Sequence, residues 1–165
     1  MAYEFNAAEI FDVACQMEKN GADFYRKMSG KISDKPVRKL LNDLALMEKA
    51  HEQVFESMQK ELTSQERIQT VFDPAGETAL YLKAMADAHV FNENAGRNFT
   101  LSETMSEKAK IIKIVRAAIS LEWESISFYV GIKEFVTEQF GKKRIDDIIK
   151  EEMRHVRILS NQLTS

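Results

Sequence analysis

The sequence contains few of the residues that cross-link or bend a chain. It has one cysteine, two prolines and six glycines among 165 residues. The single thiol, Cys15, cannot form an internal disulfide, which fits a reducing cytoplasm. Because proline and glycine are scarce, a turn-rich β fold is disfavoured and long helices are favoured.

Long apolar runs and basic clusters are also missing. No apolar stretch approaches the roughly 18 residues that would span a bilayer. The first residues, MAYEFNAAEIFD, include acids early and lack the apolar segment of a signal peptide. The net charge is −3, which argues against a nucleic-acid surface. We therefore expect a cytoplasmic protein, one domain over residues 1–165, that binds neither membranes nor nucleic acid.

What the sequence does contain is an internal repeat of metal-binding residue types. A lone glutamate and a Glu-x-x-His pair occur twice at one offset: Glu18, Glu48 and His51 are each followed 104 residues later (122 − 18, 152 − 48, 155 − 51) by Glu122, Glu152 and His155. The pair Phe24-Tyr25 recurs as Phe128-Tyr129 at the same offset. Residues at i and i+3 share one face of a helix, so each Glu-His pair would point in one direction.

Hydrophobic spacing predicts four long helices that carry these residues. The first begins after Asn6 and is interrupted at Gly30, and the second runs from near Pro36 to Leu62. The third begins near Ser106, Gly141 breaks the chain, and the fourth covers about 142–163. A shorter helical pattern covers 77–91 within the long link between residues 62 and 106.

These elements predict an all-α fold, a four-helix bundle of two related helical hairpins. The long link would act as a crossover that carries the short extra helix and joins the hairpins across the bundle. The short helix would cap the bundle or cover a contact between subunits.

The repeated glutamates lie on stripes that are otherwise apolar. A buried, unpaired carboxylate is strongly unfavourable, and four close together would also repel each other. Two divalent cations would resolve both problems, because four carboxylates balance two M²⁺ ions and the imidazoles add neutral nitrogen ligands. Oxygen with imidazole nitrogen suits iron or manganese, and zinc is possible. A metal-free bundle with these residues on solvated faces is the alternative.

The pattern resembles the ferritin-like di-iron carboxylate proteins, and most closely the rubrerythrin-type di-iron domain, over nearly the whole chain. The resemblance implies two iron ions, with Glu18 and Glu122 as terminal ligands and Glu48 and Glu152 as bridges. It implies that His51 and His155 each hold one iron. It also implies that Tyr25 and Tyr129, seven residues after the terminal glutamates, hydrogen-bond to ligand carboxylates, although a plain aromatic core would also explain them.

The resemblance further implies an oxidoreductase that uses its iron pair to react with O₂ or H₂O₂. Rubrerythrins carry one more carboxylate on the third helix, where this chain has Ser125, matched by Gly21 in the first half. They also carry a rubredoxin-like Cys₄ module that is missing here, so an electron donor would be a separate protein. The remaining ligand set is symmetric and also resembles a ferroxidase centre.

Two other functions stay open from the sequence. One is iron binding or storage in a cage. The sequence argues against a cage, because only ten residues follow His155, too few for a further helix. The other is a non-catalytic helical bundle that acts by binding a partner. Family resemblance favours a homodimer. Asp43 and Asp147 also repeat at the same offset, and they either orient a histidine or lie on a solvated face. Trp123 is expected to pack on a neighbouring helix.

Overall fold

A computed structural model shows four long α-helices: α1 (Ala7–Ser29), α2 (Lys35–Glu61), α5 (Glu107–Lys133) and α6 (Lys142–Thr164). The structure describes residues 7–64, 77, 80–81, 84–85, 99–134, 136 and 141–164, and none of these lies in a β-strand. The all-α prediction is confirmed. The predicted starts of all four helices, and the predicted ends of the first, second and fourth, lie within a few residues of the observed bounds, whereas α5 ends at Lys133, before the predicted break at Gly141.

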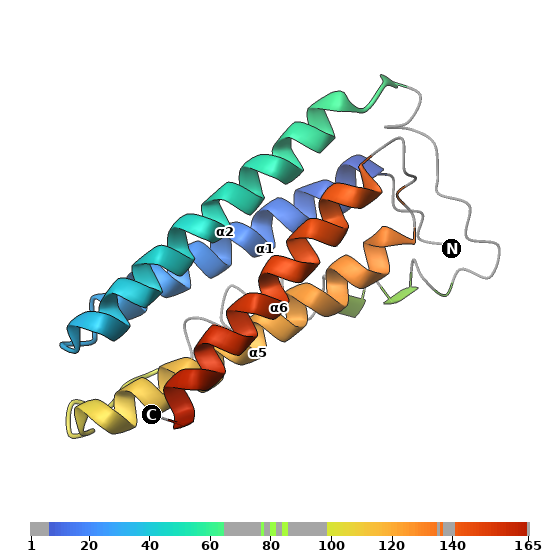
Figure 1. Cartoon of the computed structure of the whole chain (residues 1–165). Helices are drawn as coiled ribbons and strands as arrows, with labels where there is room; N and C mark the ends of the chain where they lie inside the picture. The colour runs from blue at the N-terminus through green and yellow to red at the C-terminus, as the bar shows by residue number, and fades with distance from the viewer. Residues whose placement is uncertain are drawn as a thin grey trace.

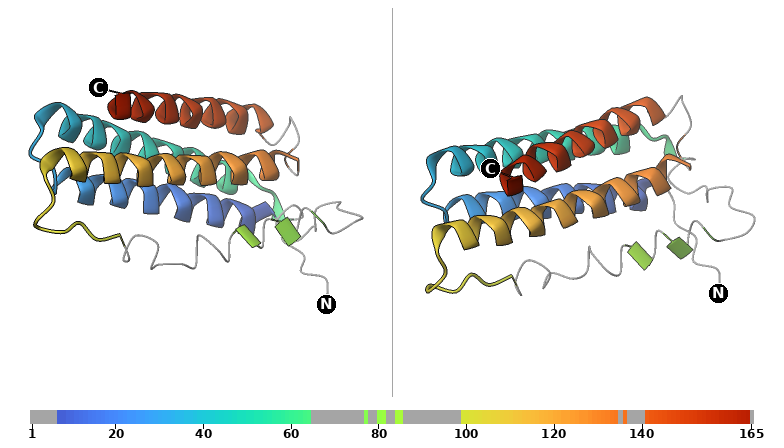
Figure 2. Two further views of the ribbon diagram at one scale, coloured as in Figure 1. Left: turned by 90° about the horizontal axis from the view of Figure 1, so that it is seen from below. Right: turned by 60° about the horizontal axis from the view of Figure 1, so that its bottom comes forward.

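The helices form two antiparallel hairpins, α1–α2 and α5–α6, that face each other along their lengths (Figures 1 and 2). Helix α1 contacts α5 and α2 contacts α6, which closes the bundle. The end of α2 and the start of α5 lie at opposite ends of the bundle (Figure 1). The two helices that the 62–106 link joins therefore have their linked ends far apart, as expected for a crossover. Of the helix predicted at 77–91, residues 77, 80, 81, 84 and 85 are helical and the rest lies outside the described residues.

The turn of the first hairpin is fixed by capping. Asp34 is the N-cap of α2 and its carboxylate accepts a hydrogen bond from the amide of Val37 at 3.0 Å. Pro36 follows in the first turn, where its missing N–H costs nothing. The guanidinium of Arg38 donates to the carbonyl of Ile32 at 2.7 and 2.9 Å. The register between α1 and α2 is thereby set close to the turn.

The second hairpin starts against this turn. Ser106 caps α5 by accepting from the amide of Ala109 at 3.2 Å. The carboxylate of Glu107 accepts from the amides of Ser33 and Asp34, the latter at 3.0 Å. At the other end, Gly141 has φ +98, a left-handed conformation that favours glycine, directly before α6. Helix caps, local hydrogen bonds and a left-handed glycine therefore determine where the helices of both hairpins begin.

The core consists of two apolar clusters separated along the bundle axis. The first cluster contains Phe11, Phe55, Tyr129, Ile132 and Ile145, and the second contains Tyr25, Leu41, Leu44, Ile114 and Leu159, each with further apolar neighbours. On every long helix, the predicted metal ligands lie between residues of the first cluster and residues of the second. The ligands therefore occupy one layer in the middle of the bundle.

One packing expectation is wrong. Trp123 is 63% exposed and does not pack into the bundle. It lies one residue after the buried Glu122, and a helix turns about 100° per residue, so its side chain points away from the core. Among the described helices, none is long and apolar enough to cross a membrane.

Candidate metal centre

The structure brings all six predicted ligand residues together in the middle layer. Each of the four helices contributes: Glu18 from α1, Glu48 and His51 from α2, Glu122 from α5, and Glu152 and His155 from α6. All six are buried, with Glu152 and His155 at 0% exposure. The i, i+3 spacing places each Glu-His pair on the inner face of its helix, as predicted.

One side of the centre is arranged around His51. Its Nδ1 lies 2.9 Å from Oε1 of Glu152, 3.5 Å from Oε2 of Glu18 and 3.7 Å from Oε2 of Glu48. One ligand atom from each of these four residues lies within 4.8 Å of the other three. The four atoms thus surround a space of the size that a metal ion would fill.

The other side is arranged around His155. Its Nδ1 lies 2.9 Å from Oε2 of Glu152, 3.3 Å from Oε1 of Glu48 and 3.5 Å from Oε1 of Glu122. Glu48 and Glu152 therefore direct one oxygen to each imidazole, whereas Glu18 lies near His51 and Glu122 near His155. That is the disposition that two bridging and two terminal ligands would need.

The ligand atoms meet without satisfying each other. Oε2 of Glu18, Oε1 of Glu48, both oxygens of Glu152 and Nδ1 of each histidine are buried and make no hydrogen bond of acceptable geometry. His51 Nδ1 and Glu152 Oε1 are only 2.9 Å apart, yet neither atom makes a hydrogen bond of acceptable geometry. Buried polar atoms without partners are costly, and oxygen and imidazole ligands aimed at a common point suit divalent cations. The residues present therefore fit a pair of metal ions.

Without metal, protons would have to balance the charges. Burial, with the nearby charge of Glu152, raises the pKa of Glu18 well above its ordinary value, and burial raises that of Glu122. Burial also pushes the pKa of Glu48 and Glu152 upward, but the adjacent imidazoles outweigh it and hold both below the ordinary range. Although burial opposes it, the surrounding carboxylates raise the pKa of His51, and that of His155 to about 12. Two carboxylates and two imidazoliums then leave the layer with no net charge.

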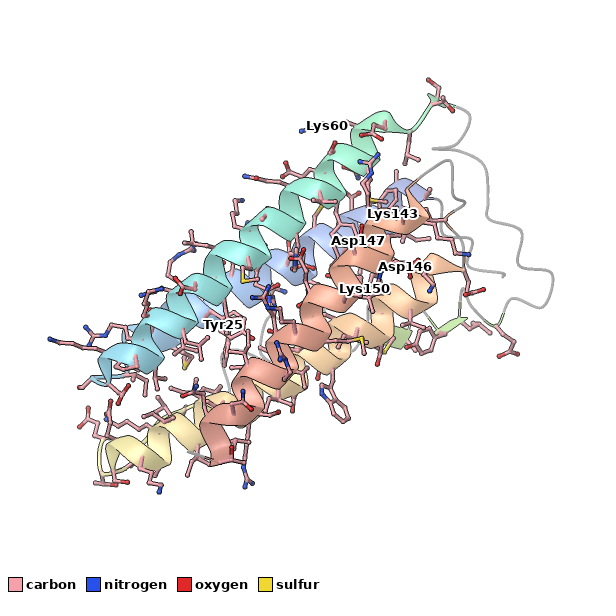
Figure 3. All side chains as sticks on the ribbon, viewed as in Figure 1. Tyr25, Lys60, Lys143, Asp146, Asp147 and Lys150 are labelled. Carbon is pink, nitrogen blue, oxygen red and sulfur yellow. The ribbon has the colours of Figure 1, made fainter. Side chains whose placement is uncertain are left out.

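Each tyrosine contacts the terminal glutamate of the opposite half. The hydroxyl of Tyr25 donates to Oε1 of Glu122, and that of Tyr129 donates to Oε1 of Glu18. The two contacts are reciprocal, because each joins the tyrosine of one half to the glutamate of the other. Tyr25 points into the space between the two hairpins (Figure 3). Burial and the facing carboxylate raise the pKa of both hydroxyls, so they remain protonated donors.

Sequence reasoning missed one residue that contacts the centre. Oε2 of Glu151 lies 2.9 Å from Nε2 of His51, on the side away from the ligand carboxylates. Glu151 has no acidic counterpart in the first half, so a search for repeated acids passes over it. The repeated acids lie on solvated faces instead, Asp43 beside Lys39 and Asp147 beside Lys143 (Figure 3). The position of Glu151 directly before the ligand Glu152 is the feature of the sequence that could have revealed its contact with His51.

The comparisons with known proteins agree with this geometry. Residues 9–163 match the rubrerythrin family. The chain belongs to the rubrerythrin family. A solved structure from Thermotoga maritima, described as a ferritin-like diiron-carboxylate protein, matches with a TM-score of 0.69 and 21% identity, covering 98% of this chain and 96% of that one. This match confirms the ferritin-like fold. A comparison with curated protein sequences gave no significant match.

Within the rubrerythrin family, this chain has a small residue at both positions one turn after the terminal glutamates. At Gly21, a Cβ would lie 3.4 Å from Cγ of Glu48, so the glycine backbone packs closely against that carboxylate side chain. Its repeat counterpart, Ser125, is partly buried. Cys15 is half-buried, its thiol donates to the carbonyl of Glu52, and burial with Glu56 raises its pKa to about 11. That thiol is therefore a weak nucleophile, as expected for a packing residue.

Proposed function

We propose that this rubrerythrin-family chain binds two iron ions in the middle layer and acts as an oxidoreductase that reduces O₂ or H₂O₂. Glu18, Glu122, His51 and His155 would each hold one ion, and Glu48 and Glu152 would hold both. A bound ferrous pair can supply the two electrons that one molecule of H₂O₂ accepts. The separate electron-donor protein, the homodimer and the cytoplasmic location remain predictions from the sequence.

The observation that carries this proposal is the set of buried, unsatisfied ligand atoms. A purely structural role would require the buried polar atoms of these glutamates and histidines to be hydrogen-bonded. Instead Oε2 of Glu18, Oε1 of Glu48, both oxygens of Glu152 and Nδ1 of each histidine make no hydrogen bond, although their residues form two close groups of ligand types. Tyr129 bonds to Oε1 of Glu18 and leaves Oε2, the oxygen that faces His51, without a hydrogen bond, whereas Tyr25 bonds to Oε1 of Glu122, the oxygen 3.5 Å from Nδ1 of His155.

The test is anaerobic reconstitution with Fe²⁺ followed by exposure to O₂ or H₂O₂. Close to two ions should bind each chain, and oxidation should produce new near-ultraviolet absorption while oxidant is consumed. Glu152→Ala should disrupt both ions because both oxygens of Glu152 face the imidazoles, whereas His51→Ala should mainly weaken one. A stoichiometry near zero would overturn the proposal.

The choice of oxidant depends on Ser125. Since rubrerythrins with a carboxylate at this position use it during peroxide reduction, the wild-type chain should reduce peroxide more slowly than they do. Ser125→Glu should raise peroxide turnover if the missing carboxylate is limiting. Unchanged turnover with two ions still bound would remove that argument and favour O₂ as oxidant.

The same material separates the alternatives. Iron storage would require a large particle that accumulates far more than two irons per chain, which the particle size in solution would reveal. A non-catalytic bundle would bind no stoichiometric metal. Manganese or zinc as the resident metal would appear in elemental analysis of protein purified without added chelator.

A further inference from the structure

The two histidines differ in what holds the outer side of each ring. Nε2 of His51 lies 2.9 Å from Oε2 of Glu151, whereas Nε2 of His155 is buried and has no hydrogen-bond partner among the described residues. Both rings otherwise present Nδ1 to the same kinds of atoms at matching distances. The ligands are therefore nearly symmetric, and the asymmetry lies one contact further out.

The repeat identifies the cause of this difference. Contacts at the centre cross between halves, as Tyr25 with Glu122 and Tyr129 with Glu18 show. Glu151 of the second half contacts His51 of the first, so the reciprocal residue for His155 is position 47 (151 − 104), which is Met47. A thioether is only a weak acceptor and cannot replace a carboxylate as a partner for an imidazole N–H.

A carboxylate on the outer nitrogen has a defined effect on a ligating histidine. It keeps the proton on Nε2, leaves the lone pair of Nδ1 available and fixes the orientation of the ring. Loss of such a partner typically weakens metal binding 10–100-fold. We propose that Glu151 is a positioning residue that makes the two metal positions unequal, so that the His51 position binds a divalent cation more tightly than the His155 position. This inference rests on the proposed function.

The experiment is an anaerobic titration with Co²⁺, which is stable to oxidation and reports its ligands through visible absorption. The wild-type chain should bind two ions in two steps whose dissociation constants differ by about 10–100-fold. Shared carboxylates can also separate two steps through repulsion between the ions, so variants must decide. Glu151→Met gives the second half the same residue that the first half has at the matching position, Met47. This variant should weaken the tight step and make the two dissociation constants more nearly equal.

The reverse change and the controls sharpen the result. Met47→Glu should strengthen the weak step about 10–100-fold by giving His155 the missing acceptor. Glu151→Gln, which keeps an acceptor oxygen without the charge, should retain most of the separation. Asp147→Asn removes the same charge one turn earlier on α6, where Asp147 pairs with Lys143 and Lys150 among the described residues, and it should leave both steps unchanged.

The outcomes distinguish this inference from the function beneath it. Two equal steps in the wild-type chain, or unequal steps that persist unchanged in Glu151→Met, would overturn the inference while two-ion binding stands. Absence of Co²⁺ binding in the wild-type chain would overturn the proposed function and the inference with it. Because Glu151 is half-exposed, its replacement is expected to leave the fold intact, which circular dichroism would check.

Discussion

The two apolar clusters and the polar layer between them differ in how they contribute to folding. In the clusters, side chains such as Leu41 and Ile114 are fully buried against other apolar groups, which stabilises the bundle without dependence on bound metal or on the protonation of these side chains. In the middle layer, Glu152 and His155 are equally buried, yet their polar atoms lack hydrogen bonds. Desolvation there is offset only by bound protons or by metal. The clusters therefore hold the helices in place, and the layer makes stability depend on metal and pH.

The largest expected effect comes from breaking a cluster. Leu41→Ala should lower the free energy of unfolding by about 2–5 kcal/mol, because Leu41 is fully buried and the substitution leaves a cavity. The change should be seen in denaturant melts with and without metal. Leu46→Ala on the same helix is the matched control, since Leu46 is 68% exposed and should cost no more than about 0.5 kcal/mol.

This comparison also requires that the Leu41→Ala protein still bind two ions per chain, because Leu41 lies outside the polar layer. Loss of metal stoichiometry in a variant that remains folded would show that the cluster and the layer are not separable as described.

The next largest effect on stability comes from adding metal to the polar layer or removing it. Metal at a hundredfold above its dissociation constant should stabilise the fold by about 2.7 kcal/mol. At roughly 2–4 °C per kcal/mol for a domain of this size, the melting temperature should rise by about 5–10 °C. Metal binding should also release protons from Glu18, Glu122, His51 and His155, because the pKa of each of these groups is raised.

The pH dependence should have opposite signs with and without metal. The raised pKa values of His51 and His155 give stability that is complete below their ordinary value of 6.5 and declines as pH rises toward the folded values. Glu18 and Glu122 act in the same direction from 4.5 upward, whereas the lowered pKa of Glu48 and Glu152 gives stability that is lost below 4.5.

The metal-free protein should therefore melt at a higher temperature near pH 5.5 than near pH 8, and the gain from metal should be larger near pH 8. Thermal melts at both pH values, with chelator or with Mn²⁺, test both signs. A metal-free protein that becomes more stable between pH 5.5 and 8 would contradict the assignment of protons to this layer.

The two kinds of region were also unequally predictable from the sequence. Apolar spacing sets the inner faces of the helices, and residues on those faces such as Phe11, Leu44, Ala118 and Ile145 are buried. Glutamate on an apolar stripe is unfavourable, and the repeat of these glutamates with the Glu-x-x-His pairs at one offset indicated the layer. Glu151 was missed because it lies at the edge of the buried face of α6, where it is half-exposed, and its contact with His51 depends on how α6 packs beside α2. That packing is a tertiary fact that spacing along one helix does not contain.

The smallest expected effect comes from the tyrosines at the boundary between the layer and the clusters. Tyr129→Phe keeps the ring in its cluster and removes only the hydroxyl that donates to Glu18. The expected loss is about 0.5–1.5 kcal/mol, the usual net value of one hydrogen bond. Tyr25→Phe should cost a similar amount, since its hydroxyl makes the reciprocal bond to Glu122. Tyr81→Phe is the control, because Tyr81 is 40% exposed and donates to the carbonyl of Ser127 and not to a glutamate of the layer. If the tyrosines orient the terminal carboxylates, both buried variants should also weaken Co²⁺ binding, each at the position of the glutamate it contacts. A double variant should then lower the affinity at both positions. Stability losses without any change in metal affinity would assign the tyrosines to the clusters alone.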